Sequence, residues 1–238
     1  MRIHNASIGL SCLCLLALSS FAAEKPDADA WTPVFDGKSL SGWTNAAGKP
    51  VEAGKGWTVE DGMLVRSGHG GDIYTAAEYA DFELKLEWKL SPGVNSGIKY
   101  RVTRYEPGGL LGPEYQLIDE ATTGRDGDMG STASHYVLKA PEGKKINPPG
   151  QWNETRIVAR GTKLEHWLNG VKVVEIDTAS DEFKQRVAKS KFAKVEGFAR
   201  NKSGRIMLQD HASGTRETRD KDVIWFRNIQ IRRLDEGD

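Results

Sequence analysis

Polar side chains gather on three short stretches of this chain that otherwise have the composition of β-strands. They are N-S-G-I-K-Y-R at 95–101, E-Y-Q-L-I-D at 114–119 and M-L-Q-D-H at 207–211. Successive side chains on a strand point to opposite faces of the sheet. Strand parity therefore predicts one shared face that carries Asn95, Gly97, Lys99, Arg101, Glu114, Gln116, Gln209 and His211. If the strands are neighbours, that face offers a carboxylate, amides, a guanidinium and an imidazole, which can bind a sugar and move a proton.

The elements that must position these residues read as many short strands joined by glycine-rich turns. Phe82 to Leu90 alternates apolar and charged residues, which is typical of a sheet with one buried face. Asp61-Gly62 and Asn169-Gly170 each predict a tight hairpin. One segment predicts a helix, capped by Thr178 or Ser180. The pattern favours an all-β fold, a two-sheet antiparallel jelly-roll sandwich with one short helical insertion.

Composition limits the class of protein. The chain has 238 residues, of which 38% are hydrophobic and 28% charged, with a formal net charge of zero. This suits a single globular domain, which we place at residues 31–236. Neutrality argues against nucleic acid or an anionic membrane as the main partner, but not against a neutral carbohydrate.

The N-terminus has the features of an export signal. Arg2 precedes an apolar run from Ile8 to Leu18, and small residues follow it. The run is too short to span a bilayer, so we predict a cleaved signal peptide at 1–23 and a polar linker at 24–30. The protein is then exported, to the periplasm or the medium. Both cysteines, Cys12 and Cys14, lie in the leader, so the mature chain needs no disulfide.

Seven motifs occur one after another along the chain. They are W-T-P-V-F-D-G-K-S-L-S-G-W from residue 31, N-S-G-I-K-Y-R, E-Y-Q-L-I-D, W-N at 152–153, H-W-L-N-G at 166–170, L-Q-D-H at 208–211 and F-R-N-I at 226–229. In this order, the motifs resemble those of the 3-keto-disaccharide hydrolase family. The resemblance covers about residues 31–234. It implies a concanavalin A-like jelly roll and an enzyme of carbohydrate metabolism that acts on glycosides oxidised to a ketone at C3.

A ketone at C3 makes the C2 proton acidic, so the C1 substituent can leave by elimination and water can add to the enone. This route needs a general base and a cation near the enolate oxygen. The base is Glu114 or His211, and both assignments stay open. Arg101 is the candidate cation, because its guanidinium is always charged. Substrate binding falls to Asn95, Gln116, Lys99, Gln209, Tyr136 and His135.

Some polar residues have simpler structural explanations. Asp119 and Asp210 are out of phase with the predicted face, and we expect them to hold local backbone or an arginine. The chain also departs from the family pattern at S-T-A-S-H-Y, where His135 replaces an aliphatic residue, and in the long turn at 211–222. Both changes are expected to affect substrate identity more than chemistry.

We expect no cofactor, because no group of His, Cys and Asp has the spacing of a zinc site. A structural calcium ion remains an alternative, although D-G-D at 126–128 is too short to assign one. Two other functions also remain open on the same fold. A non-catalytic carbohydrate-binding module predicts an exposed aromatic platform, and a protein-docking domain predicts a large exposed apolar patch.

Overall fold

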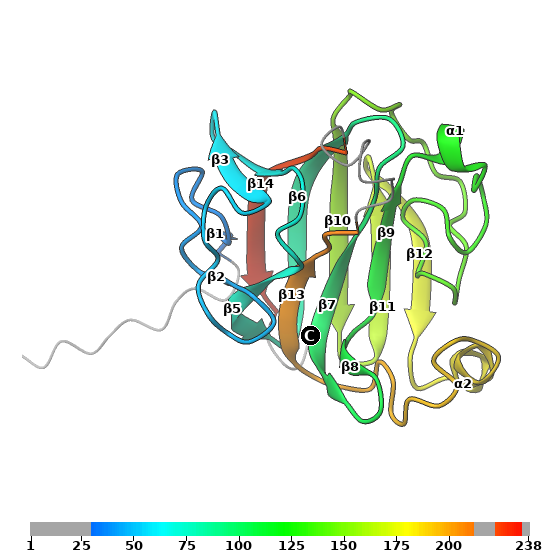
Figure 1. Cartoon of the computed structure of the whole chain (residues 1–238). Helices are drawn as coiled ribbons and strands as arrows, with labels where there is room; N and C mark the ends of the chain where they lie inside the picture. The colour runs from blue at the N-terminus through cyan, green and yellow to red at the C-terminus, as the bar shows by residue number, and fades with distance from the viewer. Residues whose placement is uncertain (1–29, 212–221, 235–238) are drawn as a thin grey trace, which may run out of the picture.

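The computed structural model describes residues 30–211 and 222–234, which form two facing antiparallel sheets (Figure 1). The predicted signal peptide and all but the last residue of the predicted linker lie outside the described residues. The eight-stranded sheet has the order β12 (Val171–Asp177), β11 (Lys163–Leu168), β10 (Asn153–Arg160), β6 (Phe82–Leu90), β14 (Ile224–Arg233), β4 (Met63–Arg66) and β3 (Trp57–Glu60), with β1 (Thr32–Pro33) also paired to β14.

The six-stranded sheet contains the three stretches singled out in the sequence. Its order is β2 (Trp43–Thr44), β5 (Ile73–Tyr79), β13 (Gly204–Leu208), β7 (Asn95–Tyr105) and β8 (Gly109–Leu111), with β9 (Glu114–Ile118) paired to β7. The stretches fall on β7, β9 and the end of β13, so β7 has the other two as its neighbours. The predicted jelly-roll class and the predicted neighbourhood of the three stretches are both confirmed.

Local sequence signals account for the turns and for the longer helix. Asp61 and Gly62 both have positive φ, 49° and 77°, between β3 and β4. Asn169 and Gly170 repeat this between β11 and β12, at 47° and 80°, as a type I′ turn requires. Helix α2 (Asp181–Ala188) begins after Ser180, whose hydroxyl accepts the Phe183 N–H. A one-turn helix, α1 (Glu120–Thr123), follows β9.

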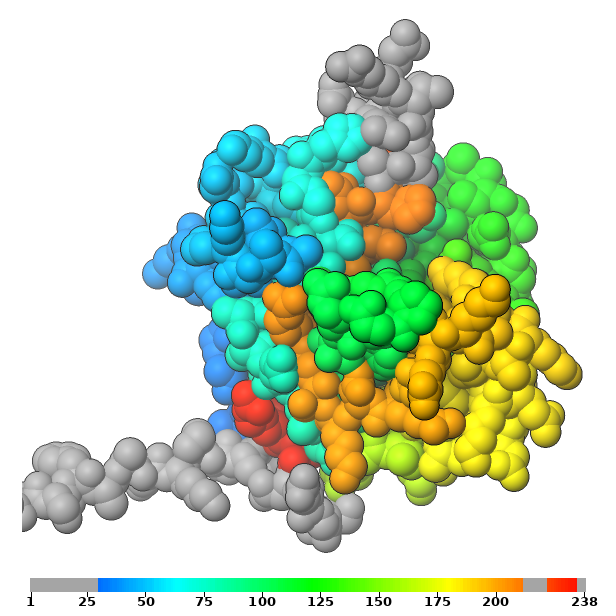
Figure 2. All heavy atoms as spheres, turned by 60° about the horizontal axis from the view of Figure 1, so that its bottom comes forward, coloured from blue at the N-terminus to red at the C-terminus, as the bar shows by residue number. Residues whose placement is uncertain are grey.

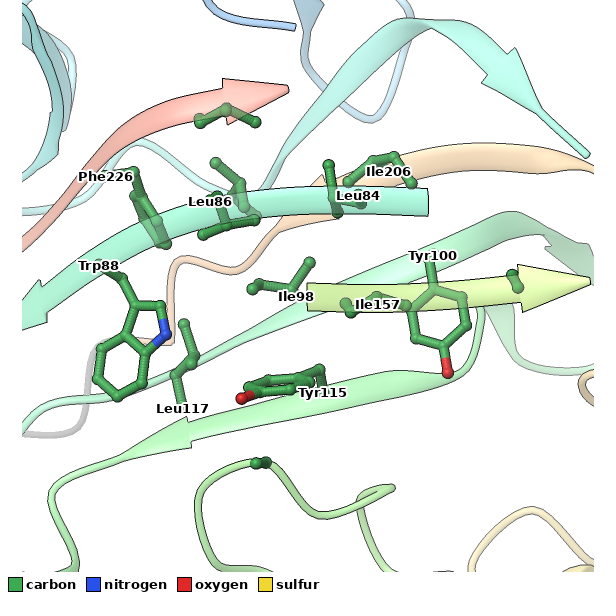
Figure 3. Packing of buried hydrophobic residues seen from close by; sticks show 14 of the residues in the cluster. Leu84, Leu86, Trp88, Ile98, Tyr100, Tyr115, Leu117, Ile157, Ile206 and Phe226 are labelled. Atoms are coloured by element: carbon green, nitrogen blue, oxygen red, sulfur yellow. The ribbon is translucent and has the colours of Figure 1, made fainter. Parts of the chain in front are cut away.

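The core fills the space between the sheets with alternate residues of both (Figure 3). Leu84, Leu86 and Trp88 on β6 face Ile98 and Tyr100 on β7, and all five are buried. The opposite face of the six-stranded sheet carries Lys99, Glu114 and Gln209, and we call it the site face. The turn between β7 and β8, in green, projects beside the gold-to-orange segment that follows α2 (Figure 2). A Cβ atom on Gly108 of this turn would lie 3.6 Å from Val195 of that segment.

No helix among the described residues is both long enough and apolar enough to cross a membrane.

Strand β7 has a bulge that moves Arg101 away from the site face. Arg205 pairs with Val102 and Met207 with Lys99, so Ile206 faces both Tyr100 and Arg101. Arg101 has a left-handed φ of 47°. Val102, and not Arg101, then packs with Met207 on the site face. The prediction that Arg101 shares a face with Lys99 is wrong, because parity counting assumes a strand without an inserted residue.

Arg101 instead ties three chain segments together at one end of the sandwich. Its guanidinium donates to Ala80 O at 2.9 Å, Gly161 O at 2.6 Å and Asp81 Oδ1 at 2.8 Å. Its side chain is only 4% exposed. The three hydrogen bonds supply partners for the buried guanidinium, which would otherwise lose water without replacement.

We predict that Arg101→Met lowers the free energy of unfolding by about 3 kcal/mol, because it strips a buried cation from Asp81 and two carbonyls. Urea unfolding measures the loss, and Arg104→Met, on an exposed arginine of the same strand, serves as the control. Turnover by the folded fraction should stay at the wild-type level. A stable Arg101→Met variant without activity would contradict this structural role and would support a role of Arg101 in the site.

Candidate functional site

Glu114 is the centre of the site face. It begins β9 directly opposite Lys99 on β7, and its side chain is only 6% exposed. Lys99 Nζ lies 3.6 Å from Glu114 Oε2, and the lysine side chain is also mostly buried. Burial raises the pKa of the Glu114 carboxyl, while the charges of Lys99, Lys191 and His211 oppose the rise. The pKa of this carboxyl group is therefore shifted in the direction of neutral pH, and a general base works best when its pKa is near the operating pH.

Gly97 makes room for this carboxylate. A Cβ atom at Gly97 would lie 2.8 Å from Glu114 Oε1 and 3.2 Å from Gln209 Oε1. No side chain other than hydrogen fits there without moving one of the two groups. The Glu114 carboxylate and the Gln209 amide thus lie over the same point of the β7 backbone.

Two amides extend the site along β7 and β9. Gln116 Nε2 donates to Asn95 Oδ1 at 2.8 Å, and the Gln116 side chain is buried. An amide that is held by a second amide presents its donor and acceptor in fixed directions. Asn95 and Gln116 are therefore placed as predicted, on the face that carries Glu114.

The residues that follow β13 supply the third side of the site. The Gln209 N–H donates to Gly97 O at 2.9 Å, and Ser96 Oγ donates to Gln209 O at 2.8 Å. His211 is exposed two residues further on, and its charge contributes to the pKa of Glu114. His211 therefore lies at the edge of the site.

Asp210 and Asp119 have the structural roles that the sequence predicted. The N–H groups of Gly70 and Gly71 both donate to Asp210 Oδ2 at 2.8 Å, and the buried Arg66 lies 3.3 Å from its other oxygen. Asp119 caps α1 and also accepts the Gly93 N–H. Of the carboxylates in the three stretches, Glu114 alone is left to do chemistry.

Tyr136 joins the site through its backbone and its ring. Its N–H donates to Glu114 O at 3.1 Å. The ammonium group of Lys191 lies over its ring, 4.3 Å from the centroid. Lys191 was not predicted from the sequence, and no signal there could have found it, since its place depends on how the segment after α2 folds back.

His135 does not line the site, and its prediction as a substrate-binding residue is wrong. The side chain is 1% exposed and stacks on His166 with centroids 5.8 Å apart and ring planes 4° apart. Neither ring nitrogen of His135 has a hydrogen-bond partner among the described residues. His166 is satisfied by Tyr100 OH at 2.9 Å and Ala133 O at 3.0 Å. The chain alternates at this point, so Tyr136 faces the site and His135 faces the core.

A mainly apolar cavity lies elsewhere in the described part of the chain. It has a volume of about 310 Å³ and opens at the end of the sandwich, between Trp88 and Asn153 on one side and Ile118 and Pro148 on the other. The site residues named above do not line it. Asp119 at this cavity is held by local donors, whereas Glu120 and Asp126, which also line it, are both paired with Lys144. Burial raises the pKa of the Glu120 carboxyl, and its contact with Lys144 opposes the rise.

The arrangement joins a buried carboxylate of raised pKa to ammonium groups and fixed amides. Such a set can take a proton from a weak carbon acid and keep the resulting negative charge compensated. It does not have the two carboxylates across a glycosidic bond that ordinary glycosidases use. Among the described residues, no group of three or more His, Cys, Asp or Glu could hold a metal ion.

A model of the 3-keto-alpha-glucoside-1,2-lyase-like domain matches residues 30–232. The chain belongs to this family. One family relative, a 3-keto-disaccharide hydrolase from Bacteroides thetaiotaomicron, is 31% identical over 245 residues, or 88% of this chain and 80% of the relative.

Solved structures agree with this family. A protein of Parabacteroides distasonis, provisionally described as a glycosyl hydrolase, is 33% identical with a TM-score of 0.73, over 87% of this chain and 96% of that one. A second protein from the same organism is 26% identical with a TM-score of 0.62, over 87% of this chain and 100% of that one. The predicted family, fold and enzyme class are thus confirmed, whereas export stays a prediction.

The buried histidine pair makes a prediction about acid stability. Burial lowers the pKa of His135 to about 3, with the charge of His166 adding to the effect, and burial lowers that of His166 to about 4. Both values lie below the unfolded value, near 6.5, so the unfolded state binds more protons. The stability that the two neutral histidines contribute is complete above about pH 6.5. It is lost as pH falls, by about 1.4 kcal/mol per pH unit for each histidine.

We expect His135→Leu to reduce the dependence of the free energy of unfolding on pH by about 1.4 kcal/mol per pH unit between pH 6 and 4. The reason is that one of the two histidines that take up a proton on unfolding is removed. It should also raise stability at neutral pH by removing two ring nitrogens without partners. Urea unfolding across the range measures both effects. His69→Gln, on an exposed histidine, is the control. Parallel curves for His135→Leu and wild type would contradict the assignment.

Proposed function

We propose that this protein cleaves 3-keto-glycosides, with Glu114 as the base that removes the C2 proton. The observation that carries the proposal is the burial of Glu114 beside Lys99, which raises its pKa but keeps a compensating cation within 3.6 Å. The relative that acts on 3-keto-disaccharides supplies the substrate class. The family name and the lone carboxylate both favour elimination over direct displacement.

The reaction proceeds in three steps. Glu114 takes the C2 proton, and the electron pair of that bond moves onto the C3 oxygen as an enolate. The enolate then collapses, and the C1–O bond breaks. The leaving oxygen takes up a proton, and we assign the donation of this proton to His211 at the edge of the site. Water adds to C1 of the enone and a proton returns to C2, so the sum is hydrolysis.

The other site residues hold the substrate in place. Asn95, Gln116 and Gln209 contact sugar hydroxyls, because amides donate and accept at once. Gly97 leaves the space above the β7 backbone to the Glu114 carboxylate and the Gln209 amide, so both groups can meet the sugar from the same point. The negative charge that moves from Glu114 onto the substrate stays within a site that carries ammonium groups, of which Lys99 is adjacent to the base.

A base and a cation are the groups that this elimination requires, and both are side chains of this chain. The proposal therefore keeps the expectation of no cofactor. It also keeps export to the periplasm or the medium, which the apolar run from Ile8 to Leu18 supports. The binding-module alternative predicted an exposed aromatic platform. Among the described residues, the large hydrophobic side chain that stands exposed is Met129.

We predict that Glu114→Gln lowers kcat/KM toward a 3-keto-disaccharide by about 10²- to 10⁴-fold, the usual contribution of a general base, with little change in folding. Substrate deuterated at C2 should show a primary isotope effect in the wild-type protein. The same disaccharide without the ketone is the control and should not react. Full activity in Glu114→Gln with loss in His211→Ala would move the base to His211, and no turnover by wild type would end the proposal.

A further inference from the structure

The segment that follows α2 is fixed against β7 by a cluster of aromatic rings. Phe192 and Phe198 stack with centroids 3.8 Å apart and planes 9° apart, and Tyr105 at the end of β7 lies 6.1 Å from Phe198. Tyr105 OH also accepts the Ala199 N–H at 3.1 Å and the Asn201 side-chain amide at 2.9 Å. The segment is therefore anchored to the strand that carries Lys99 (Figure 2).

This anchor determines where Lys191 lies, because the lysine directly precedes Phe192. Its ammonium group lies over the ring of Tyr136, at 4.3 Å, and near that of Phe192, at 5.1 Å. Tyr136 is bonded through its N–H to the backbone of Glu114. Lys191 thus reaches the site from a part of the chain far from β7 and β9, close enough for its charge to act on Glu114.

The two lysines of the site are held in different ways. Lys99 faces the Glu114 carboxylate, and its charge offsets the cost of burying that group. In the part of the chain that the structure describes, the contacts of the Lys191 ammonium are ring faces, and no ion pair holds it. A ring face positions a cation without neutralising it. The charge of Lys191 is therefore available to a new anion.

We propose that Lys191 is a catalytic residue that binds the C3 oxygen of the substrate and stabilises the enolate. This rests on the proposed function and assigns a second task within it. Lys99 keeps Glu114 ionised before the proton moves, and Lys191 receives the charge afterwards. The role that the sequence predicted for Arg101, a cation near the enolate oxygen, is therefore taken by a lysine from the segment after α2.

The test compares three variants: Lys191→Met, which removes the charge at similar length; Lys191→Arg, which keeps it; and Lys194→Met, on an exposed lysine of the same segment. Lys191→Met should lower kcat by about 10²- to 10³-fold, the usual effect of losing one donor to a developing oxyanion, with a smaller change in KM. Lys191→Arg should retain most of the activity. Lys194→Met should match wild type.

A second readout separates a direct role from a structural one. Removing a nearby positive charge raises the pKa of a carboxyl group, so the acidic limb of kcat/KM should move to higher pH in Lys191→Met. A ¹³C titration of the Glu114 carboxyl should show the same upward shift and needs no turnover. The two control variants, Lys191→Arg and Lys194→Met, should leave both the acidic limb and the Glu114 titration near those of wild type.

The outcomes distinguish this proposal from the function on which it rests. If Lys191→Met behaves as Lys194→Met in kcat and in the titration, Lys191 has no such role, although the wild-type protein remains active. A loss of kcat with a lower melting temperature and an unmoved titration would make Lys191 structural and would also overturn the proposal. A wild-type protein without activity on 3-keto-glycosides would refute the proposed function itself, whatever the titration shows.

Discussion

The register of β7 against β9 and β13 is the constraint on which the site depends. It places Lys99 opposite Glu114, and it places the backbone of Gly97 beneath Glu114 and Gln209. A slip of one residue would turn Ile98 and Tyr100 to the site face and Lys99 into the core. The register is strongly fixed, because Ile98 and Tyr100 are fully buried against the eight-stranded sheet. The packing of the core thus sets the geometry of the site on the other side of the same strand.

The bulge at Tyr100 and Arg101 limits how far this arrangement extends. Before it, β7 pairs with β9 and presents polar residues on the site face. After it, β7 pairs with β8, and the same face carries the apolar Val102, which packs against Met207 of β13. Arg101 is turned to the end of the sandwich, where it holds Asp81 and Gly161. The inserted residue therefore separates the part of the strand that carries chemistry from the part that carries packing.

Most of the fold could be predicted, because it depends on local signals. Phe82–Leu90 is a strand from alternation alone, and Asn169-Gly170 is a turn because both residues need positive φ. The site was predictable as far as parity holds, which gave Asn95, Lys99, Glu114, Gln116 and Gln209. Parity failed at Arg101, since nothing local in Y-R-V shows that Ile206 faces two residues. His135 and Lys191 depend on tertiary packing, which a strand pattern does not contain.

The buried Glu114 carboxyl and the buried pair of histidines make both the proposed chemistry and the stability of this protein depend on pH. The proposed base works only when Glu114 is ionised, and burial has raised the pKa at which that happens. The core requires His135 and His166 to be neutral, and burial has lowered the pKa of both. The shifts have opposite directions but the same consequence, because acid neutralises the carboxylate and adds charge to the core. Tyr136 connects the two regions: its N–H bonds to Glu114, and its neighbour in the chain is His135. The carboxyl of Glu114 on one face of β9 and the imidazole pair on the other are therefore both buried groups whose native charge state is lost in acid.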